Sequence, residues 1–224
     1  MRRRARDIPS RIKVRRGPKK GRYDRASIDA VLDGGLLAHV AFVEDDEPVC
    51  IPMLYARVGD RIYIHGSTKS RAVRALAAGA PACVTVTAVH ALVLARSAFE
   101  HSANYDSAMA FGTFTLVEDP GERMRAFEAF TEKLLPGRWD EVRQPSATEL
   151  KATEILALEI GEASAKVRTG PPDDDDSADA ERDTWAGVLP ILTSYGEPEA
   201  SPGLRPGIPL SDSVRRLLTR DPPG

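Results

Sequence analysis

Residues 82–89 read ACVTVTAV, a stretch in which apolar side chains alternate with cysteine and threonine. A period of two places Val84 and Val86 on one face of a β-strand and the two threonines on the other. A strand of this kind belongs to a sheet with one apolar face and one mixed face. The pattern continues toward residues 92–95, so the alternation predicts a long strand in a protein built around a sheet.

Three strands joined by short turns precede this stretch. They are expected over residues 38–43, 49–55 and 61–65, with DDEP at 45–48 as the first turn and Gly59-Asp60 as the second. Strands joined by such short, turn-forming links pair antiparallel. These segments therefore predict hairpins within one antiparallel sheet.

Two long strands follow the stretch at 82–89. They are expected over residues 105–117 and 154–168 and bring the expected number of strands to six. Helices are expected after Asp24, over residues 68–78 and after Asp119, with capping residues at their starts. Six strands, mostly linked as hairpins, with helices at the ends and edges predict a mainly β fold. The expected architecture is a small six-stranded antiparallel barrel.

The last of these helices carries the fullest set of local signals. Asp119 can cap it, Pro120 fits its first turn, and Glu122 completes a capping box. An apolar stripe at helical spacing follows, and we expect it to lie in the core: Met124, Phe127, Phe130 and Leu134.

The composition narrows the class of protein. Hydrophobic residues make up 42% of the 224 residues and charged residues 29%, with a formal net charge of −2. These values exclude a disordered chain, a collagen and a disulfide framework. The apolar runs are far shorter than the roughly 18 residues of a membrane span, and none follows the basic start MRRRARD. We therefore expect a cytoplasmic protein that does not enter a membrane.

The charges are unevenly distributed along the chain. Residues 1–22 form a basic arm, 23–170 a compact body, 171–183 an acidic linker and 184–224 a proline-rich tail. Residues 185–192 of the tail are apolar enough to dock on the body. A basic arm can indicate nucleic-acid binding, but aromatic residues are only 6% and none are interleaved with basic motifs. We expect an arm that packs on its own acidic body and no nucleic-acid partner.

Cysteine and histidine form no metal motif. Cys50 and Cys83 lie far apart in apolar runs, a spacing that matches no zinc site and favours buried free thiols. The four histidines form no HxH or HxxxH pair, so no metal site is expected. The sequence also lacks the GxSxG elbow of a serine nucleophile.

The stretch with the most chemical information is IYIHGSTKSR at residues 62–71. A strand ends there, Gly66 allows a tight turn, and hydroxyl residues start a helix whose free N–H groups favour an anion. Lys69 and Arg71 are unfavourable in a first helical turn, and a bound phosphate would reverse this. The alternative is an ordinary capped helix with two surface cations. The spacing matches neither a P-loop nor a dinucleotide glycine motif.

A second polar stretch is HSANYDSAMAFG at residues 101–112, where polar side chains open a long strand that becomes apolar. Hydroxyl and amide groups at the mouth of a barrel can bond the polar edge of a ring system. The alternative is a strand edge with its loop.

In their order and spacing, these stretches resemble the pyridoxamine 5′-phosphate oxidase-like superfamily of FMN-binding split barrels. Within it, the chain is most similar to the nitroimidazole-resistance-like, flavin-nucleotide-binding branch. The resemblance covers roughly residues 18–170. The motifs that carry it are YDR at 23–25, AHVAFV at 38–43, IPMLY at 51–55, Gly59-Asp60, IHGS at 64–67, Ser70-Arg71, NYDS at 104–107, Gly112 and SAKVR at 164–168.

The resemblance implies a homodimer of split barrels with FMN in the cleft between the subunits. It implies phosphate ligands from the turn at 67–71, backbone bonds from the strand at 52–55, and ring contacts near Ser107. The cofactor-binding residues that it predicts are Pro52, Met53, Leu54, Tyr55, His65, Gly66, Ser67, Lys69, Ser70, Arg71, Tyr105 and Ser107.

The implied function is that of an FMN-binding oxidoreductase that passes a hydride through flavin N5 to or from a small substrate. The alternatives are a non-catalytic protein that binds flavin, haem or a deazaflavin, and a nitroimidazole reductase. No residue is assigned as catalytic, although His65 and Tyr105 are the candidates for an acid or base. Asp106 stands where the oxidase itself has an arginine, which argues against a vitamin B6 substrate.

Overall fold

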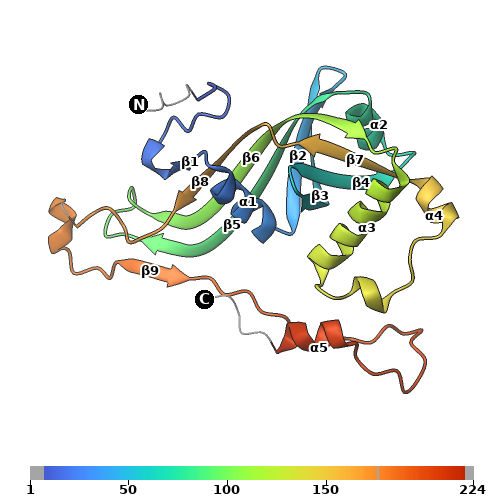
Figure 1. Cartoon of the computed structure of the whole chain (residues 1–224). Helices are drawn as coiled ribbons and strands as arrows, with labels where there is room; N and C mark the ends of the chain where they lie inside the picture. Colours follow the sequence, from blue (N-terminus) through green and yellow to red (C-terminus); the bar gives the residue numbers. More distant parts are fainter. Residues whose placement is uncertain (1–7, 176, 220–224) are drawn as a thin grey trace, which may run out of the picture.

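Six strands close into an antiparallel barrel in the computed structural model, which describes residues 8–175 and 177–219 (Figure 1). They pair in the order β6-β7-β4-β3-β2-β5, and β5 pairs again with β6, so that the ring is complete. This confirms the predicted barrel. Its strands are β2 (Leu37–Glu44), β3 (Glu47–Val58), β4 (Arg61–Ser67), β5 (Pro81–Leu94), β6 (Ser102–Leu116) and β7 (Thr153–Glu159).

Three further strands extend the sheet beyond the barrel. β8 (Glu162–Arg168) pairs with β6, β1 (Gly21–Arg22) pairs with β8, and β9 (Gly187–Pro190) pairs with the far end of β5. The expected single strand at 154–168 is therefore wrong, since it is divided into β7 and β8. The division follows from the partners, because β7 pairs with β4 while β8 pairs with the opposite end of β6.

Strand β6 changes its partner along its length, and this change splits the barrel. Its residues 105–111 pair with β8, whereas residues 114–116 pair with β7. Gly112 lies between the two sets. A Cβ atom there would lie 3.3 Å from Cγ of Leu158 on β7, so the glycine gives room where the sheets diverge.

The first hairpin turns more tightly than the sequence indicates. The turn was expected over 45–48, but β2 and β3 are joined by Asp45 and Asp46 alone, at φ 50° and 62°. Two consecutive residues at positive φ match the twist of the flanking strands, as in a type I′ turn. β3 therefore begins at Glu47.

The helices are α1 (Arg25–Gly34), α2 (Arg71–Ala77), α3 (Pro120–Leu134), α4 (Ala147–Ala152) and α5 (Asp212–Leu218). Asp24 and Asp119 cap α1 and α3 as predicted, each accepting a bond from a backbone N–H three residues ahead. The expected start of α2 at residue 68 is wrong, because the Ser70 side chain accepts from the N–H of Val73 and so defines the N-cap.

The expected role of Glu122 in a capping box is not found. Its Oε1 instead accepts from the Tyr63 hydroxyl at 2.8 Å and from Arg61 at 2.7 Å, which ties α3 to β4. The α3 stripe is only partly in the core. Phe130 is buried and Phe127 packs beside it, whereas Leu134 is 50% exposed at the end of the helix.

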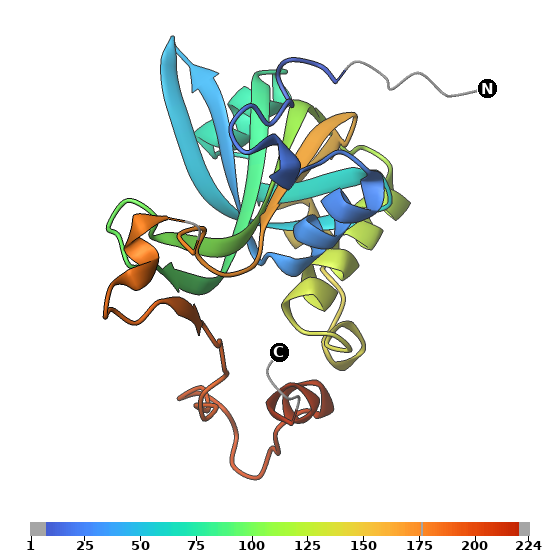
Figure 2. The same ribbon diagram turned by 90° about the vertical axis from the view of Figure 1, so that its left-hand side faces the viewer.

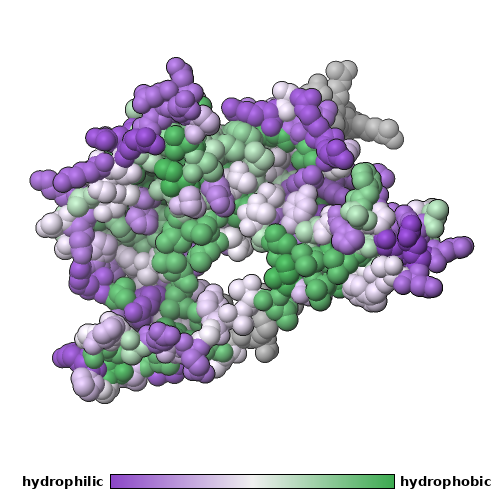
Figure 3. All heavy atoms as spheres, turned by 180° about the vertical axis from the view of Figure 1, so that it is seen from behind, coloured by the Kyte–Doolittle hydropathy of each residue, from purple (hydrophilic) through white to green (hydrophobic). Residues whose placement is uncertain are grey.

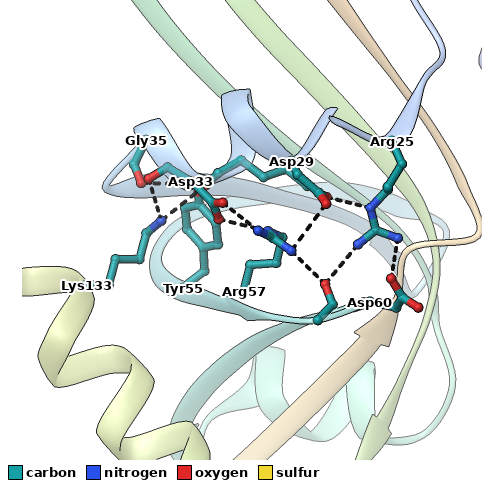
Figure 4. Close-up of polar contacts among 10 residues, drawn as sticks. Arg25, Asp29, Asp33, Gly35, Tyr55, Arg57, Asp60 and Lys133 are labelled. Carbon is teal, nitrogen blue, oxygen red and sulfur yellow. Dashed lines mark hydrogen bonds and ion pairs between the residues drawn. The ribbon is translucent and has the colours of Figure 1, made fainter. Parts of the chain in front are cut away.

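A polar network fastens α1 across the end of the barrel (Figure 4). The buried Tyr55 hydroxyl donates to the carbonyls of Leu32 and Gly35, where α1 ends. Lys133 of α3 donates to the same Leu32 carbonyl at 3.1 Å, and its ammonium lies over the Tyr55 ring. Arg57 pairs with both Asp29 and Asp33 of α1. Together these contacts hold α1 against β3 and α3.

The tail, residues 184–219, leaves the barrel at β9, passes beneath it and returns as α5 beside the segment after α3 (Figures 1 and 2). There the N–H of Ser213 donates to Glu141 at 2.8 Å, and Arg138 donates to Ser211. Between these anchors the tail encloses an opening bordered by apolar residues (Figure 3). No helix among the described residues is long and apolar enough to span a membrane.

Replacing Tyr55 with phenylalanine tests the role of the α1 network. The substitution removes a buried hydroxyl and leaves two carbonyls at the end of α1 without that donor, so we expect the free energy of unfolding to fall by about 1–3 kcal/mol. Urea unfolding measures this loss. Tyr195→Phe is the matched control, because Tyr195 is 67% exposed and its replacement should change stability by less than about 0.5 kcal/mol.

Candidate functional site

The turn between β4 and α2 carries most of the predicted phosphate ligands. β4 ends at Ser67, whose carbonyl accepts from the N–H of Ser70 at 2.9 Å, and whose hydroxyl accepts from the N–H of Lys69. The Ser70 side chain serves as the helix cap. Hydroxyl and N–H groups therefore converge as the sequence predicts, but several already bond one another within the turn.

The two cations of this turn differ in their surroundings. Arg71 pairs with Glu44, at 2.7 Å from Nε to the carboxylate, although it is 69% exposed. Lys69 is exposed, and no ion pair to it occurs within residues 8–175 and 177–219. An anion at this turn would therefore meet one unpaired cation and would compete with Glu44 for the other.

The neighbouring strand β3 has an open backbone edge. Residues 47–54 pair with β2, but only residues 55–58 pair with β4, because β4 diverges to follow β7 through Ser67. In the part of the chain that the structure describes, no strand covers the other edge of residues 47–54. Pro48 and Pro52 lack a backbone N–H, as is common on unpaired edges. Backbone groups at 50–54 are thus accessible to a ligand beside the turn at 67–71.

The four predicted residues of β3 divide between its faces. Pro52 and Leu54 are exposed on the outer face, opposite His39 and Leu37 of β2. Met53 packs against the core, and Tyr55 is buried with its hydroxyl bound to α1. Side-chain contacts to a ligand are therefore open only to Pro52 and Leu54.

His65 lies between the barrel and α3. Its ring centroid is 4.5 Å from that of Phe130, and Nδ1 is buried without a hydrogen-bond partner among the described residues. Burial lowers the pKa of the imidazole below its ordinary value of 6.5. His65 is therefore neutral at neutral pH, and its buried Nδ1 is not accessible to a substrate.

The other two predicted residues, Tyr105 and Ser107, lie at a separate place on the outer face of β6. They line a cavity of about 380 Å³ beneath the basic arm. The Ser107 hydroxyl is 3.1 Å from that of Thr87, and the Lys166 ammonium lies 5.9 Å from the centre of the Tyr105 ring. Its walls are formed by Arg11, Ile12, Lys13, Val14, Arg15, Arg16, Tyr105, Ser107, Met109, Ser164 and Lys166.

One chain does not bring the two groups of predicted residues together. Arg71 contacts Glu44 at the end of β2, whereas Ser107 pairs with Thr87, beyond the β5 residues that pair with β2. None of the predicted residues of β3 or of the turn at 67–71 is among the residues that line the cavity with Tyr105 and Ser107. The turn at 67–71 and the cavity are therefore separate half-sites.

Some structural features near the candidate site carry no signal in the sequence. Arm residues cover the cavity, but no motif in the sequence distinguishes them from other basic residues. His90 lies in a β-bulge, where Nε2 is 3.0 Å from the Asp106 carboxylate. Cys50 was expected to be buried, but it is exposed because it lies on the outer face of β3. No cluster of three metal-ligating side chains occurs among the described residues.

These features define a split-barrel protein. The six-stranded barrel is split at β6, β3 has an open edge, and a polar strand–turn–helix segment lies beside that edge. The family model of pyridoxamine 5′-phosphate oxidase matches residues 24–167. The chain belongs to this family, as its sequence motifs predicted. No curated protein sequence matches it.

Two solved structures are similar over nearly the whole chain. The FAD and haem binding protein from Mycobacterium smegmatis is 46% identical, with a TM-score of 0.84, over 88% of this chain and 97% of the other. The flavocytochrome Anf3 from Azotobacter vinelandii is 37% identical, with a TM-score of 0.86, over 93% and 96%. A candidate 5-nitroimidazole antibiotic resistance protein from Bacteroides thetaiotaomicron shares the fold at 18% identity and a TM-score of 0.57, over 66% and 86%.

The partial burial of the His65 imidazole predicts a pH dependence of stability. Its pKa is lower in the folded than in the unfolded chain, so the unfolded state binds more protons as the pH falls through about 6.5. The wild type should therefore lose more stability between about pH 7.5 and pH 5 than His65→Asn does. Urea unfolding at each pH measures this. Equal losses in both proteins would contradict the assignment, and His101→Asn, an exposed histidine, is the control.

Proposed function

We propose that this protein binds a flavin nucleotide and acts as a flavin-dependent oxidoreductase. The observation that carries the proposal is the open edge of β3 at residues 50–54 beside the turn at 67–71. The pyrimidine edge of a flavin presents alternating donors and acceptors, which complement an unpaired strand edge. The phosphate of the same molecule suits the N–H groups and Lys69 of the turn. When bound, the flavin supplies hydride or single-electron transfer.

FAD is the flavin that we propose, in place of the FMN predicted from the sequence. The two structures that match almost the whole chain are described as an FAD and haem binding protein and as a flavocytochrome. Identities of 46% and 37% over such coverage support a shared cofactor. Chromatography of the flavin released from purified protein distinguishes FAD from FMN.

We also propose that two copies of the chain form the complete site. On one chain, the cavity at Ser107 shares no lining residue with the turn at 67–71 or with the open edge of β3. The outer face between them exposes apolar side chains, among them Leu37, Leu54 and Met109. A two-fold arrangement buries such a face and joins the turn of one copy to Ser107 of the other. Sedimentation measures the resulting dimer.

Haem is a second group that we propose, because both of these related structures are described with haem or as a cytochrome. Of the histidines in the described residues, His90 is the one that would best hold the haem iron. Its Nε2 contacts Asp106, an arrangement typical of metal-bound imidazoles, and its side chain is 51% exposed.

Arg71→Ala tests the flavin site. If Arg71 turns from Glu44 to a bound phosphate, its loss should weaken flavin binding by about 1.5–3 kcal/mol, or roughly 10- to 100-fold. Fluorescence titration of the apoprotein gives the dissociation constant. Arg74→Ala removes an exposed arginine from the same helix and is the matched control. An unchanged affinity in Arg71→Ala would leave the turn as a capped helix with surface cations.

His90→Ala tests the haem site. The variant should lose the Soret band that haem gives with the wild type, while the flavin absorbance stays the same. His101→Ala is the control, because its Nδ1 bonds the carbonyl of Ser97 in an exposed loop. A Soret band that survives in His90→Ala would refute this ligand, and a colourless wild type that takes up no flavin would refute the flavin proposal.

A further inference from the structure

The cavity beneath the basic arm has an unusual concentration of charge. Five cationic side chains line it: Arg11, Lys13, Arg15, Arg16 and Lys166. No aspartate or glutamate is among its walls. Arg11 is neutralised by Glu162, with 2.8 Å from Nε to the carboxylate. For the other four, no ion pair occurs within the described ranges of the chain.

Several arginines elsewhere in the molecule are paired. Arg57, Arg61, Arg96 and Arg143 each contact one or more carboxylates of the same chain. Four unpaired cations around one concave site repel one another, and the repulsion is stronger where protein excludes water. An anionic ligand would remove this cost, whereas a neutral ligand would not.

The arm is held in place by contacts that do not use the charged groups of these four residues. Arg11 stacks on Phe111, with 5.0 Å to the ring centre, and bonds Glu162. The N–H of Val14 donates to the Tyr23 hydroxyl at 2.8 Å, and β1 pairs with β8. Lys13, Arg15 and Arg16 are therefore fixed over the cavity from both sides, and replacing them leaves the anchors intact.

The walls also indicate the kind of anion. A volume of about 380 Å³ is at the low end of small-molecule sites. The Tyr105 ring and Met109 offer apolar surface, while Ser107 and Ser164 offer hydroxyl groups. A diphosphate joined to a ribose and a ring matches this mixture of charge, hydroxyl and aromatic surface. A nucleic acid would need an open groove that continues beyond the cavity.

We infer that this cavity binds the diphosphate of a dinucleotide, clamped by Lys13, Arg15 and Arg16 of the arm. The inference rests on the proposed flavin function, since Tyr105 and Ser107 belong to the predicted flavin site. Two sources share this chemistry. One is bound FAD, whose flavin-side phosphate stays at the turn at 67–71 while its adenosine-side phosphate enters the cavity. The other is the diphosphate of a reduced nicotinamide dinucleotide that delivers electrons to the flavin.

The test replaces Lys13, Arg15 and Arg16 together with glutamine in the full-length protein. The matched control replaces Lys19, Lys20 and Arg22 with glutamine. It removes the same charge from the same arm, but these three residues do not line the cavity. Dissociation constants for FAD, FMN, NADPH and ADP are measured at about 0.15 M salt, where charges more than about 8 Å away are largely screened. Circular dichroism establishes that both variants are folded.

A loss of at least tenfold in FAD affinity, with FMN affinity changed less than twofold, supports the cavity as the site of the adenosine-side phosphate of FAD. A loss of affinity that is confined to NADPH supports the nicotinamide dinucleotide as the ligand. ADP alone tests the cavity independently of flavin binding, so a failure of the flavin proposal is recognised separately. If the cavity variant binds FAD, NADPH and ADP as tightly as the control does, the inference is overturned. Tighter binding of a single-stranded oligonucleotide than of ADP would also overturn it.

Discussion

The barrel depends on strand β6, which hydrogen-bonds to three other strands. It pairs with β5 along its length, with β8 in its first part and with β7 near its end. This arrangement closes the ring of six strands and also supports β8 and β1, on which the basic arm rests. Gly112 lies at the change of partner, where a larger side chain would press on Leu158. Both half-sites are therefore positioned by the same strand pairing.

Divergence of strands at the split also creates the accessible backbone of the site. Because β4 follows β7 through Ser67, it leaves β3 after Ile64, and residues 50–54 keep a free edge. A fully paired barrel would offer no such groups, since each backbone donor and acceptor would be used within the sheet. The backbone groups open to the proposed ligand thus result directly from incomplete strand pairing, and the edge prolines keep further strands from pairing there.

Local sequence signals predicted the fold well, because they act over a few residues. The alternation at 82–89 placed β5, and Asp24 and Asp119 correctly marked two helix starts. The wrong predictions concern segments whose structure depends on residues far away in the sequence. Residues 154–168 were predicted as one strand but form β7 and β8, which pair with different strands. Glu122 bonds Tyr63 and Arg61 instead of capping its own helix. The motif at 62–71 indicated the turn, but nothing local indicates that His90 meets Asp106 or that the arm covers Tyr105.

The pairing of β4 with β7 has a consequence for the order in which the protein is made. Arg61 and Glu159 face each other in this ladder, although 98 residues separate them. The hairpins from β2 to β4 and from β5 to β6 are formed by neighbouring segments, and can assemble as they leave the ribosome. The ring can close only after residue 159 has emerged. Until then, one edge of β4 and the end of β6 lack their partner β7, so the nascent chain carries an open sheet with an exposed apolar interior.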